Sequence, residues 1–288
     1  MTLCEDRVVI VTGAGRGIGR AHALAFAAAG ARVVVNDLSA AVAEEVADMI
    51  GPRAVVNTDD VGTWAGAARV IEAAVTTFGG LDVLVNNAGI VRDRMIVSCG
   101  EDEWDEVVRV HLKGHFAPLH HAAAHWRAVH KTGGAVSGRV INTSSGAGLF
   151  GSVGQANYSA AKAGIASMTL VAAAELARYG ITVNAIAPAA RTRMTEATFA
   201  ESMAAPEDGF DAMAPENISP LVVWLGSEEA GDVTGRMFEV DGGRVCVVHG
   251  WQRGPEIDKG ERWSPEELGS VVRKLVADDH PTPVYGAR

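Results

Sequence analysis

The chain has 288 residues, of which 48% are hydrophobic, and its formal net charge is −10 at pH 7. This acidity argues against a nucleic-acid-binding surface, because binding to phosphate backbones needs clustered Lys and Arg. Three scattered cysteines fit neither a disulfide framework nor a metal cluster and indicate a reducing, cytoplasmic compartment, and neither a secretory leader nor a membrane span is recognisable.

Short β-branched runs alternate along the chain with Ala-rich segments of helical period. The expected strands are 8–11, 33–35, 54–57, 83–85, 139–142, 182–186 and 237–240. The expected helices are 19–29, 40–50, 63–78, 101–130, 158–179 and 218–226. This order is typical of βαβ units, and continuous apolar strands indicate a sheet covered on both faces. We predict a single doubly wound, Rossmann-type α/β domain over residues 1–250, with a seven-stranded parallel sheet and helices on both faces.

Residues 251–288 differ from the rest in being rich in charge, Pro and Trp, and we expect a C-terminal extension there. Ser264-Pro265-Glu266-Glu267 predicts a helix start, with Ser as N-cap, Pro at the first position and Glu three residues after the cap. One short helix to about Ala277 should follow.

The segment TGAGRGIG at 12–19 joins the first strand to the first helix. Glycines there bring the backbone close to a pyrophosphate, and the helix N-terminus supplies N–H donors. A tight turn is the simpler interpretation of glycines alone, but the position between strand and helix favours a dinucleotide site. The candidate binding residues are Gly13, Arg16, Gly17, Ile18 and Gly19.

Asp37 stands at the end of the second strand, where a carboxylate accepts hydrogen bonds from the adenosine ribose and repels a 2′-phosphate. It therefore favours NAD over NADP, although an Asp that starts the next helix is an alternative. Arg16 favours NADP, because a guanidinium in the glycine loop can pair with the 2′-phosphate. The carboxylate carries more weight, so NAD is the expected cofactor.

Two further segments lie at carboxyl ends of strands, where open α/β sheets bind ligands. They are Asp60-Val61 and Asn87-Ala88-Gly89, and their polar and small side chains suit adenine and ribose contacts. Ordinary turn chemistry would also explain them.

Tyr158 and Lys162 are at i and i+4 on one face of one helix, and Ser145 follows the strand 139–142. Hydride transfer at a carbon that bears oxygen needs a group that exchanges a proton with that oxygen. A phenol has a pKa near 10, so we expect the charge of Lys162 and of an oxidised nicotinamide to lower it. Ser145 would hydrogen-bond the same oxygen.

At these residues the sequence resembles the short-chain dehydrogenase/reductase superfamily, over residues 5 to about 245. The motifs are TGAGRGIG at 12–19, DV at 60–61, NNAG at 86–89, SSGAG at 144–148, YSAAK at 158–162 and DGG at 241–243. The resemblance implies that Ser145, Tyr158 and Lys162 are catalytic, that Tyr158 and Lys162 also contact the cofactor, and that Pro188 and Thr192 hold the nicotinamide end. It also implies a homodimer or homotetramer. His111 stands where the family has a relay Asn, and Ala189 replaces a Gly.

Asn36-Asp37-Leu38, Val110-His111-Leu112 and the tail resemble the (3R)-hydroxyacyl-CoA dehydrogenase unit of peroxisomal-type multifunctional enzymes. This implies an NAD-dependent enzyme that interconverts a secondary alcohol and a ketone, with a 3-hydroxyacyl-CoA or a similar apolar hydroxy compound as substrate. The alternatives are an NADPH-dependent 3-oxoacyl-carrier-protein reductase, a steroid dehydrogenase, or a cofactor-binding protein without turnover.

Two other features bear on the prediction. The segment 195–217 is expected to form a lid over the substrate, as in the family. His120, His121, His125 and His130 cluster on one helix, but no third ligand type lies nearby, so we expect helix packing or a subunit face and no metal.

Overall fold

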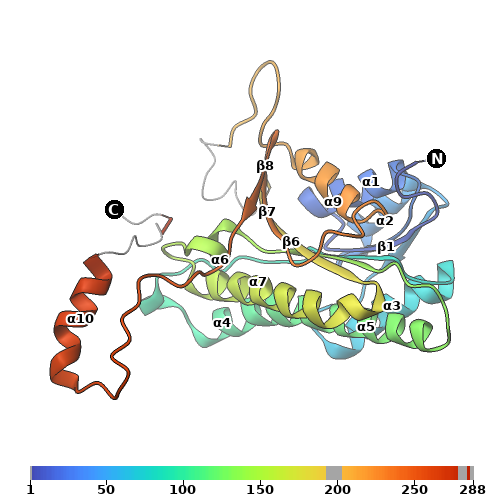
Figure 1. The fold of residues 1–288 in the computed structure, drawn as a ribbon. Coiled ribbons are helices and arrows are strands. Elements are labelled where there is room, and N and C mark those ends of the chain that lie inside the picture. The colour runs from blue at the N-terminus through green and yellow to red at the C-terminus, as the bar shows by residue number, and fades with distance from the viewer. Residues whose placement is uncertain (1, 193–202, 278–283, 286–288) are drawn as a thin grey trace.

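The computed structural model describes residues 2–192, 203–277 and 284–285. Its centre is one twisted sheet in the order β3-β2-β1-β4-β5-β6-β7-β8 (Figure 1). The strands are β1 Val8–Thr12, β2 Arg32–Asn36, β3 Ala54–Asn57, β4 Val83–Asn86, β5 Arg139–Thr143, β6 Thr182–Ala189, β7 Met237–Asp241 and β8 Arg244–Val248. The first seven are parallel to their neighbours, as expected.

The prediction of a seven-stranded, wholly parallel sheet is wrong in one respect. β8 pairs with β7 in the antiparallel sense, with Asp241 opposite Arg244. Gly242 between them has φ +49°, the left-handed conformation that a tight hairpin turn requires. A glycine turn followed by a β-branched run is a hairpin signal, so residues 242–248 carried a local indication of this eighth strand.

Helices cover both faces of the sheet (Figure 1). The helices packed with one core are α1 Gly17–Ala28, α2 Ala40–Ile50 and α9 Ser219–Leu225. Those of the second core are α3 Trp64–Phe78, α5 Gly114–Lys131 and α7 Ala156–Leu176. Successive strand residues alternate between the two cores, as the period of two requires: Val9 and Val11 face the first, and Val8 and Ile10 the second.

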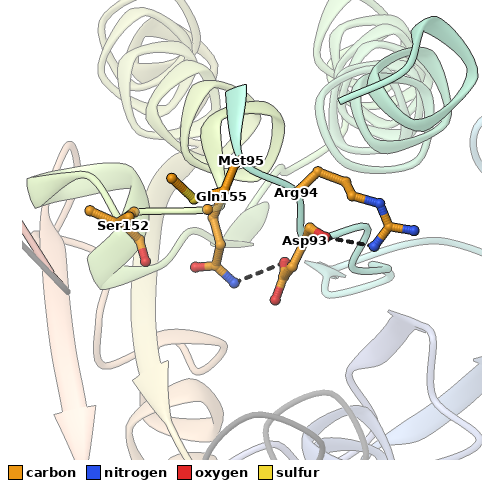
Figure 2. Close-up of a pocket in the computed structure, with 7 residues that line it drawn as sticks. Asp93, Arg94, Met95, Ser152 and Gln155 are labelled. Carbon is orange, nitrogen blue, oxygen red and sulfur yellow. Dashed lines mark hydrogen bonds between the residues drawn. The ribbon is translucent and has the colours of Figure 1, made fainter. Parts of the chain in front are cut away.

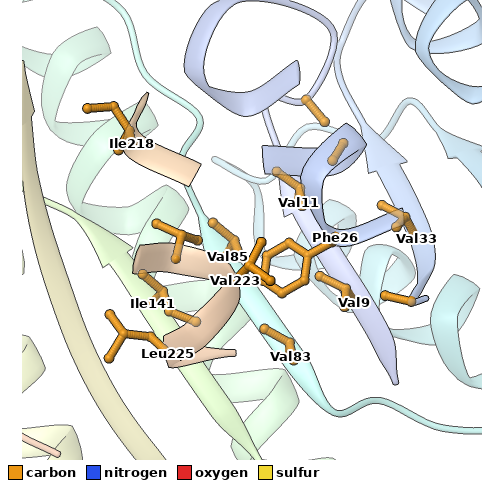
Figure 3. Close-up of a cluster of buried hydrophobic side chains, with 14 of the residues drawn as sticks. Val9, Val11, Phe26, Val33, Val83, Val85, Ile141, Ile218, Val223 and Leu225 are labelled. Atoms are coloured by element: carbon orange, nitrogen blue, oxygen red, sulfur yellow. The ribbon is translucent and has the colours of Figure 1, made fainter. Parts of the chain in front are cut away.

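Phe26 of α1 is central to the first core, where its ring lies among Val9, Val83 and Val223 (Figure 3). It is fully buried, and a Cβ on Gly226 would come within 2.6 Å of its ring. Truncation of a buried Phe to Ala costs roughly 3–5 kcal/mol. This core fixes the start of α1, and therefore the glycine loop, against the sheet.

The expected helix 101–130 is present, but it changes character on the way. α4 Glu101–Val108 runs into η2 Arg109–Lys113, which is one turn of π-helix, and α5 continues to Lys131. Single π-helical turns inside α-helices occur frequently at functional sites. His111 lies in this turn.

The remaining elements are short. They are η1 Ile96–Ser98, α6 Gly146–Phe150, η3 Ala177–Tyr179 and η4 Pro215–Ile218. The helical stretch Ala156–Tyr179 has the length and apolar composition of a membrane span, a test that core helices of globular folds also pass. It packs on β5, β6, α4 and α6, and therefore belongs to the helical layer of the sheet.

The predicted C-terminal helix is confirmed as α10 Pro265–Ala277. The carboxylate of Glu267 accepts a hydrogen bond from the Ser264 N–H at 2.9 Å, which is half of the expected capping box. In Figure 1, α10 stands apart from the sheet and its covering helices. Beyond it, Val153 N–H donates to the carbonyl of Tyr285 at 2.9 Å, so the described end of the extension lies against the loop after α6.

Candidate active site

The site lies at the carboxyl edge of the sheet, around β1 and β4. The chain places β2 on one side of β1 and β4 on the other, so this is the point at which the strand order reverses. Open α/β sheets bind ligands in the crevice outside such a switch point. The loops after β1, β2, β4 and β5 all end there.

The glycine loop has the backbone geometry that its sequence predicts. Gly13 and Gly17 have φ +62° and +51°. A Cβ on Gly13 would lie 2.9 Å from the Cα of Ala88, and one on Gly19 would lie 2.1 Å from the Gly13 carbonyl oxygen. Since larger side chains would be excluded, the turn brings β1, β4 and the start of α1 into close approach. This cradle fits a pyrophosphate at the N-terminus of α1.

Asp37 lies beside the same loop. One of its carboxylate oxygens accepts from Gly15 N–H at 3.1 Å, and the other accepts from Ser39 N–H at 3.0 Å. The contact with Ser39 is the one expected of an Asp at a helix start. The contact with Gly15 places the carboxylate beside the glycine loop, where the ribose is expected to bind. Both interpretations of Asp37 are therefore compatible with its position. Arg16 is exposed at the start of α1.

Asn87 and Ala88 tie the end of β4 to the loop. Both of their N–H groups point at the Thr12 hydroxyl, at 2.9 and 3.1 Å, and the Asn87 amide donates to the Thr12 carbonyl at 3.0 Å. Ile18 and Gly17 are half-buried at the start of α1. The structure therefore brings this part of the predicted cofactor set together.

Asp60 and Val61 follow β3 at the same edge. The Asp60 carboxylate accepts from Arg109 at 2.7 Å and from Gly62 N–H at 2.8 Å, and Val61 is buried. Arg109 opens the π-helical turn, so this ion pair ties the turn to the adenine side of the predicted site. Sequence spacing gave no indication of this pair.

The predicted catalytic side chains come from three elements. Ser145 is the N-cap of α6, and its oxygen accepts from Ala147 N–H at 3.2 Å. Tyr158 and Lys162 lie on one face of α7, with the Lys162 ammonium nitrogen 5.5 Å from the centre of the Tyr158 ring. That nitrogen also donates to the Thr143 carbonyl at 2.6 Å. A hydroxyl, a phenol and an amine thus converge beside the end of β5.

The electrostatics differ from the expectation in one respect. Burial raises the pKa of Tyr158; a hydrogen bond from Ser145 lowers it, and the charge of Asp93 raises it further. Burial also lowers the pKa of Lys162, to about 7. Lysine therefore does not hold the phenol pKa below its ordinary value here, because the site is too dry for full charge on the amine.

His111 occupies the position of the family's relay Asn. Its ring is buried, and its Nε2 lies 2.6 Å from the Ile90 carbonyl oxygen and 3.0 Å from the Ile90 nitrogen. A Cβ on Gly89 would come within 2.4 Å of this ring. Gly89 is thus required for close packing against His111.

A pocket of about 230 Å³ lies at the N-terminal end of α7, the helix that carries Tyr158 (Figure 2). The residues that line it are Asp93, Arg94, Met95, Ser152, Val153, Gly154 and Gln155. The lining includes Gln155, which is the N-cap of α7 and lies three positions before Tyr158 in the sequence. We take this pocket as the candidate substrate site. Sequence reasoning missed its residues, and nothing in their local pattern indicates that residues 93 and 155 meet.

Tyr285 of the extension is a second missed residue. Its ring lies 5.8 Å from that of Phe150, and a Cβ on Gly146 would touch it at 2.9 Å. The ring therefore covers α6, the helix that Ser145 caps. No spacing rule connects residue 285 to residue 146.

Of the two predicted nicotinamide-end residues, Thr192 lies near the glycine loop. Pro188 pairs with Val240 at the end of β6, and Thr192 lies 3.4 Å from the position of a Cβ on Gly17. Residues 195–202 of the expected lid lie outside the described part of the chain. Asp211, in the described part of that segment, forms an ion pair with Arg191, which precedes it.

The histidine cluster takes part in packing. His121 Nε2 lies 3.2 Å from the Trp64 carbonyl oxygen, and the rings of both His120 and His121 contact the Trp64 indole. Among the residues that the structure describes, no group of three or more His, Cys, Asp or Glu is arranged to hold a metal ion.

Comparison with known families agrees with this geometry. The family model described as short chain dehydrogenase matches residues 7–202. A crystal structure of a short chain dehydrogenase from Mycobacterium avium is 62% identical, with a TM-score of 0.92, and the match covers 99% of this chain and 100% of that one.

Three curated relatives carry more specific names. Hydroxyacyl-CoA dehydrogenase ChsB1 of Mycobacterium tuberculosis is 43% identical over 98% of this chain and 92% of its own length. Peroxisomal multifunctional enzyme type 2 of Mus musculus is 40% identical over 94% of this chain, which spans 34% of that longer protein. A 3-oxoacyl-acyl-carrier-protein reductase of Synechocystis is 40% identical over 85% of this chain and 99% of its own.

Proposed function

Because the chain belongs to the short-chain dehydrogenase family of oxidoreductases, we propose that it is an NAD-dependent dehydrogenase of (3R)-3-hydroxyacyl-CoA thioesters. The observation that carries the proposal is the convergence of Ser145, Tyr158 and Lys162 at the carboxyl edge of the sheet, the edge that also bears the glycine loop. The substrate class rests on the relatives named hydroxyacyl-CoA dehydrogenase and peroxisomal multifunctional enzyme, which align with nearly the whole chain.

The cofactor that the family uses supplies a hydride acceptor when it is bound. Gly13, Gly17 and Gly19 with the start of α1 would hold its pyrophosphate, and Asp37 its ribose. Asp37 supports NAD, because a carboxylate at this edge repels a 2′-phosphate. Thr192, close to Gly17, would hold the nicotinamide end.

The chemistry assigned to this chain's own groups is proton transfer. In the oxidation, Tyr158 as phenolate takes the proton of the substrate hydroxyl, while Ser145 hydrogen-bonds the same oxygen and keeps it in place. Lys162, held by the Thr143 carbonyl with its nitrogen 5.5 Å from the centre of the Tyr158 ring, would contact the bound cofactor. In the reverse direction, Tyr158 returns the proton to the oxygen.

The test follows the absorbance of reduced nicotinamide while the purified protein oxidises (3R)- and (3S)-3-hydroxyacyl-CoA of several chain lengths, with NAD and NADP in parallel. We expect turnover with NAD and the (3R) form. Tyr158→Phe should lose turnover and keep cofactor binding, which separates acid/base chemistry from a fold defect. Absence of turnover with either cofactor would reject the thioester substrate and direct attention to steroid and small ring alcohols.

A second candidate is an NADPH-dependent 3-oxoacyl-carrier-protein reductase. Arg16, exposed at the start of α1, and the Synechocystis relative favour it. Preference for NADPH in the same assay, with reduction of 3-oxoacyl thioesters, would select this alternative.

We also propose that the protein is a homo-oligomer in a reducing, cytoplasmic compartment. Apolar Phe116, Leu170 and Val171 on α5 and α7 are about half exposed, and a groove of about 360 Å³ runs between these helices. The cysteines are free. Light scattering on the purified protein measures the assembly, and a monomer at micromolar concentration would reject it.

A further inference from the structure

The loop after β4 is fastened to the start of the helix that carries Tyr158. The Asn157 amide donates to the Arg92 carbonyl at 3.0 Å, and the Gln155 amide donates to a carboxylate oxygen of Asp93 at 3.0 Å (Figure 2). Since Gln155 caps α7, the Asp93 carboxylate is held at the N-terminal end of that helix, in the wall of the substrate pocket.

The charge of Asp93 has no cationic partner among the residues that the structure describes. The neighbouring Arg92 pairs with Glu106 at 2.9 Å, and Arg94 pairs with Glu103 at 3.0 Å. Both flanking guanidinium groups are therefore neutralised by other carboxylates, and the printed partner of the Asp93 carboxylate is an uncharged amide. Of the two charged residues in the pocket wall, Arg94 is therefore paired with a carboxylate outside it, and Asp93 has no ion pair within the described part of the chain.

The N-terminus of α7, which is the positive end of the helix dipole, is close to the Asp93 carboxylate. The Gln155 amide holds the carboxylate at this end of the helix. The charge of Asp93 also acts on the phenol, because the pKa of Tyr158 is raised by burial and, in addition, by Asp93.

We propose that Asp93 is a charge filter of the substrate pocket, which disfavours ligands with a carboxylate near the reacting carbon and accepts uncharged thioesters and esters. This inference rests on the proposed function and deepens it, because a 3-hydroxyacyl thioester is uncharged where the corresponding free hydroxy acid is an anion. Two like charges in one partly desolvated pocket repel each other strongly enough to change affinity on the order of tenfold or more.

The experiment measures equilibrium binding and does not depend on turnover. Titration calorimetry gives the dissociation constants of acetoacetate and of methyl acetoacetate for the protein saturated with NAD, which cannot reduce either ketone. These two probes differ by one negative charge and one methyl group. We expect the wild-type protein to prefer the ester by about tenfold. In Asp93→Asn, which keeps a hydrogen-bonding amide beside Gln155, the preference should fall to about threefold or less.

Asp105→Asn is the matched control, because Asp105 is exposed on the neighbouring α4 and does not line the pocket. It should leave the preference unchanged. Equal affinity of the wild-type protein for the two probes, failure of the ester to bind, or an unchanged preference in Asp93→Asn would each overturn the filter. If the wild-type protein prefers the ester but does not oxidise hydroxyacyl-CoA, the inference about Asp93 stands and the proposed substrate is rejected.

Discussion

The imidazole ring of His111 stands edge-on to the phenol ring of Tyr158, with the ring centroids 5.1 Å apart and the planes at 88°. The same imidazole contacts both backbone groups of Ile90, so it joins the π-helical turn to the loop after β4. Burial, and then the charge of Lys162, lowers the pKa of His111 to about 3, which keeps the ring neutral in the ordinary pH range. His111 is therefore a positioning residue for Tyr158.

Substitutions of His111 should separate positioning from proton transfer. His111→Asn retains a donor and an acceptor for Ile90, and we expect it to keep kcat within about tenfold of the wild type. His111→Leu leaves buried backbone groups unpaired, which costs roughly 1–3 kcal/mol of stability. Steady-state kinetics and thermal melting measure both effects. A shift of the pH profile in His111→Asn would contradict the assignment, because a neutral ring does not titrate there.

Ser145→Ala should move the pH dependence of the oxidation. The phenolate is the active form, so kcat/KM rises as pH increases through the pKa of Tyr158. The Ser145 hydrogen bond lowers that pKa against burial, and its loss should therefore shift the rising limb to higher pH. Removal of one stabilising donor also lowers kcat by about 10²-fold. Ser152→Ala, in the pocket wall, is the control, and an unshifted limb in Ser145→Ala would reject the coupling.

Asp37→Ala should exchange the cofactor preference. Without the carboxylate, the 2′-phosphate is no longer repelled, and Arg16 remains exposed close by. We expect kcat/KM with NADP to rise and that with NAD to fall, each by about tenfold. Loss of the contact to Gly15 also loosens the loop, so melting without cofactor is measured in parallel. No change in the ratio of the two cofactors would leave Asp37 with its helix-start role only.

Tyr285→Ala tests whether the extension serves the substrate pocket. Its ring packs on Phe150 and Gly146, next to the pocket residues 152–155. We expect KM for acyl substrates to rise about threefold or more with little change in kcat, since no reacting group is removed. Tyr179→Ala, at the far end of the α7 stretch, is the comparison. Equal KM values in both variants would restrict Tyr285 to stability.

Much of the fold was predictable because local patterns specify it. Seven expected strands are present, and the apolar runs of the central strands β1, β4 and β5 are buried on both faces, as a parallel sheet requires. The eighth strand had a local signal in Gly242, which was overlooked. The expected long helix was correct in extent, but periodicity did not indicate its π-helical turn, whose His111 contacts Ile90, 21 residues away in the chain.

The sequence by itself determined the reaction class. The glycine loop is specified within one turn, because backbone conformation is a local property. Tyr158 and Lys162 share a helix face because they are four residues apart, which is also a local property. Only the tertiary structure decided what surrounds these groups. It placed Asp93 against Gln155 and Tyr285 against Phe150, and it raised the pKa of Tyr158 by burial. Burial and the charge of distant neighbours depend on how the whole chain packs, and no local spacing specifies them.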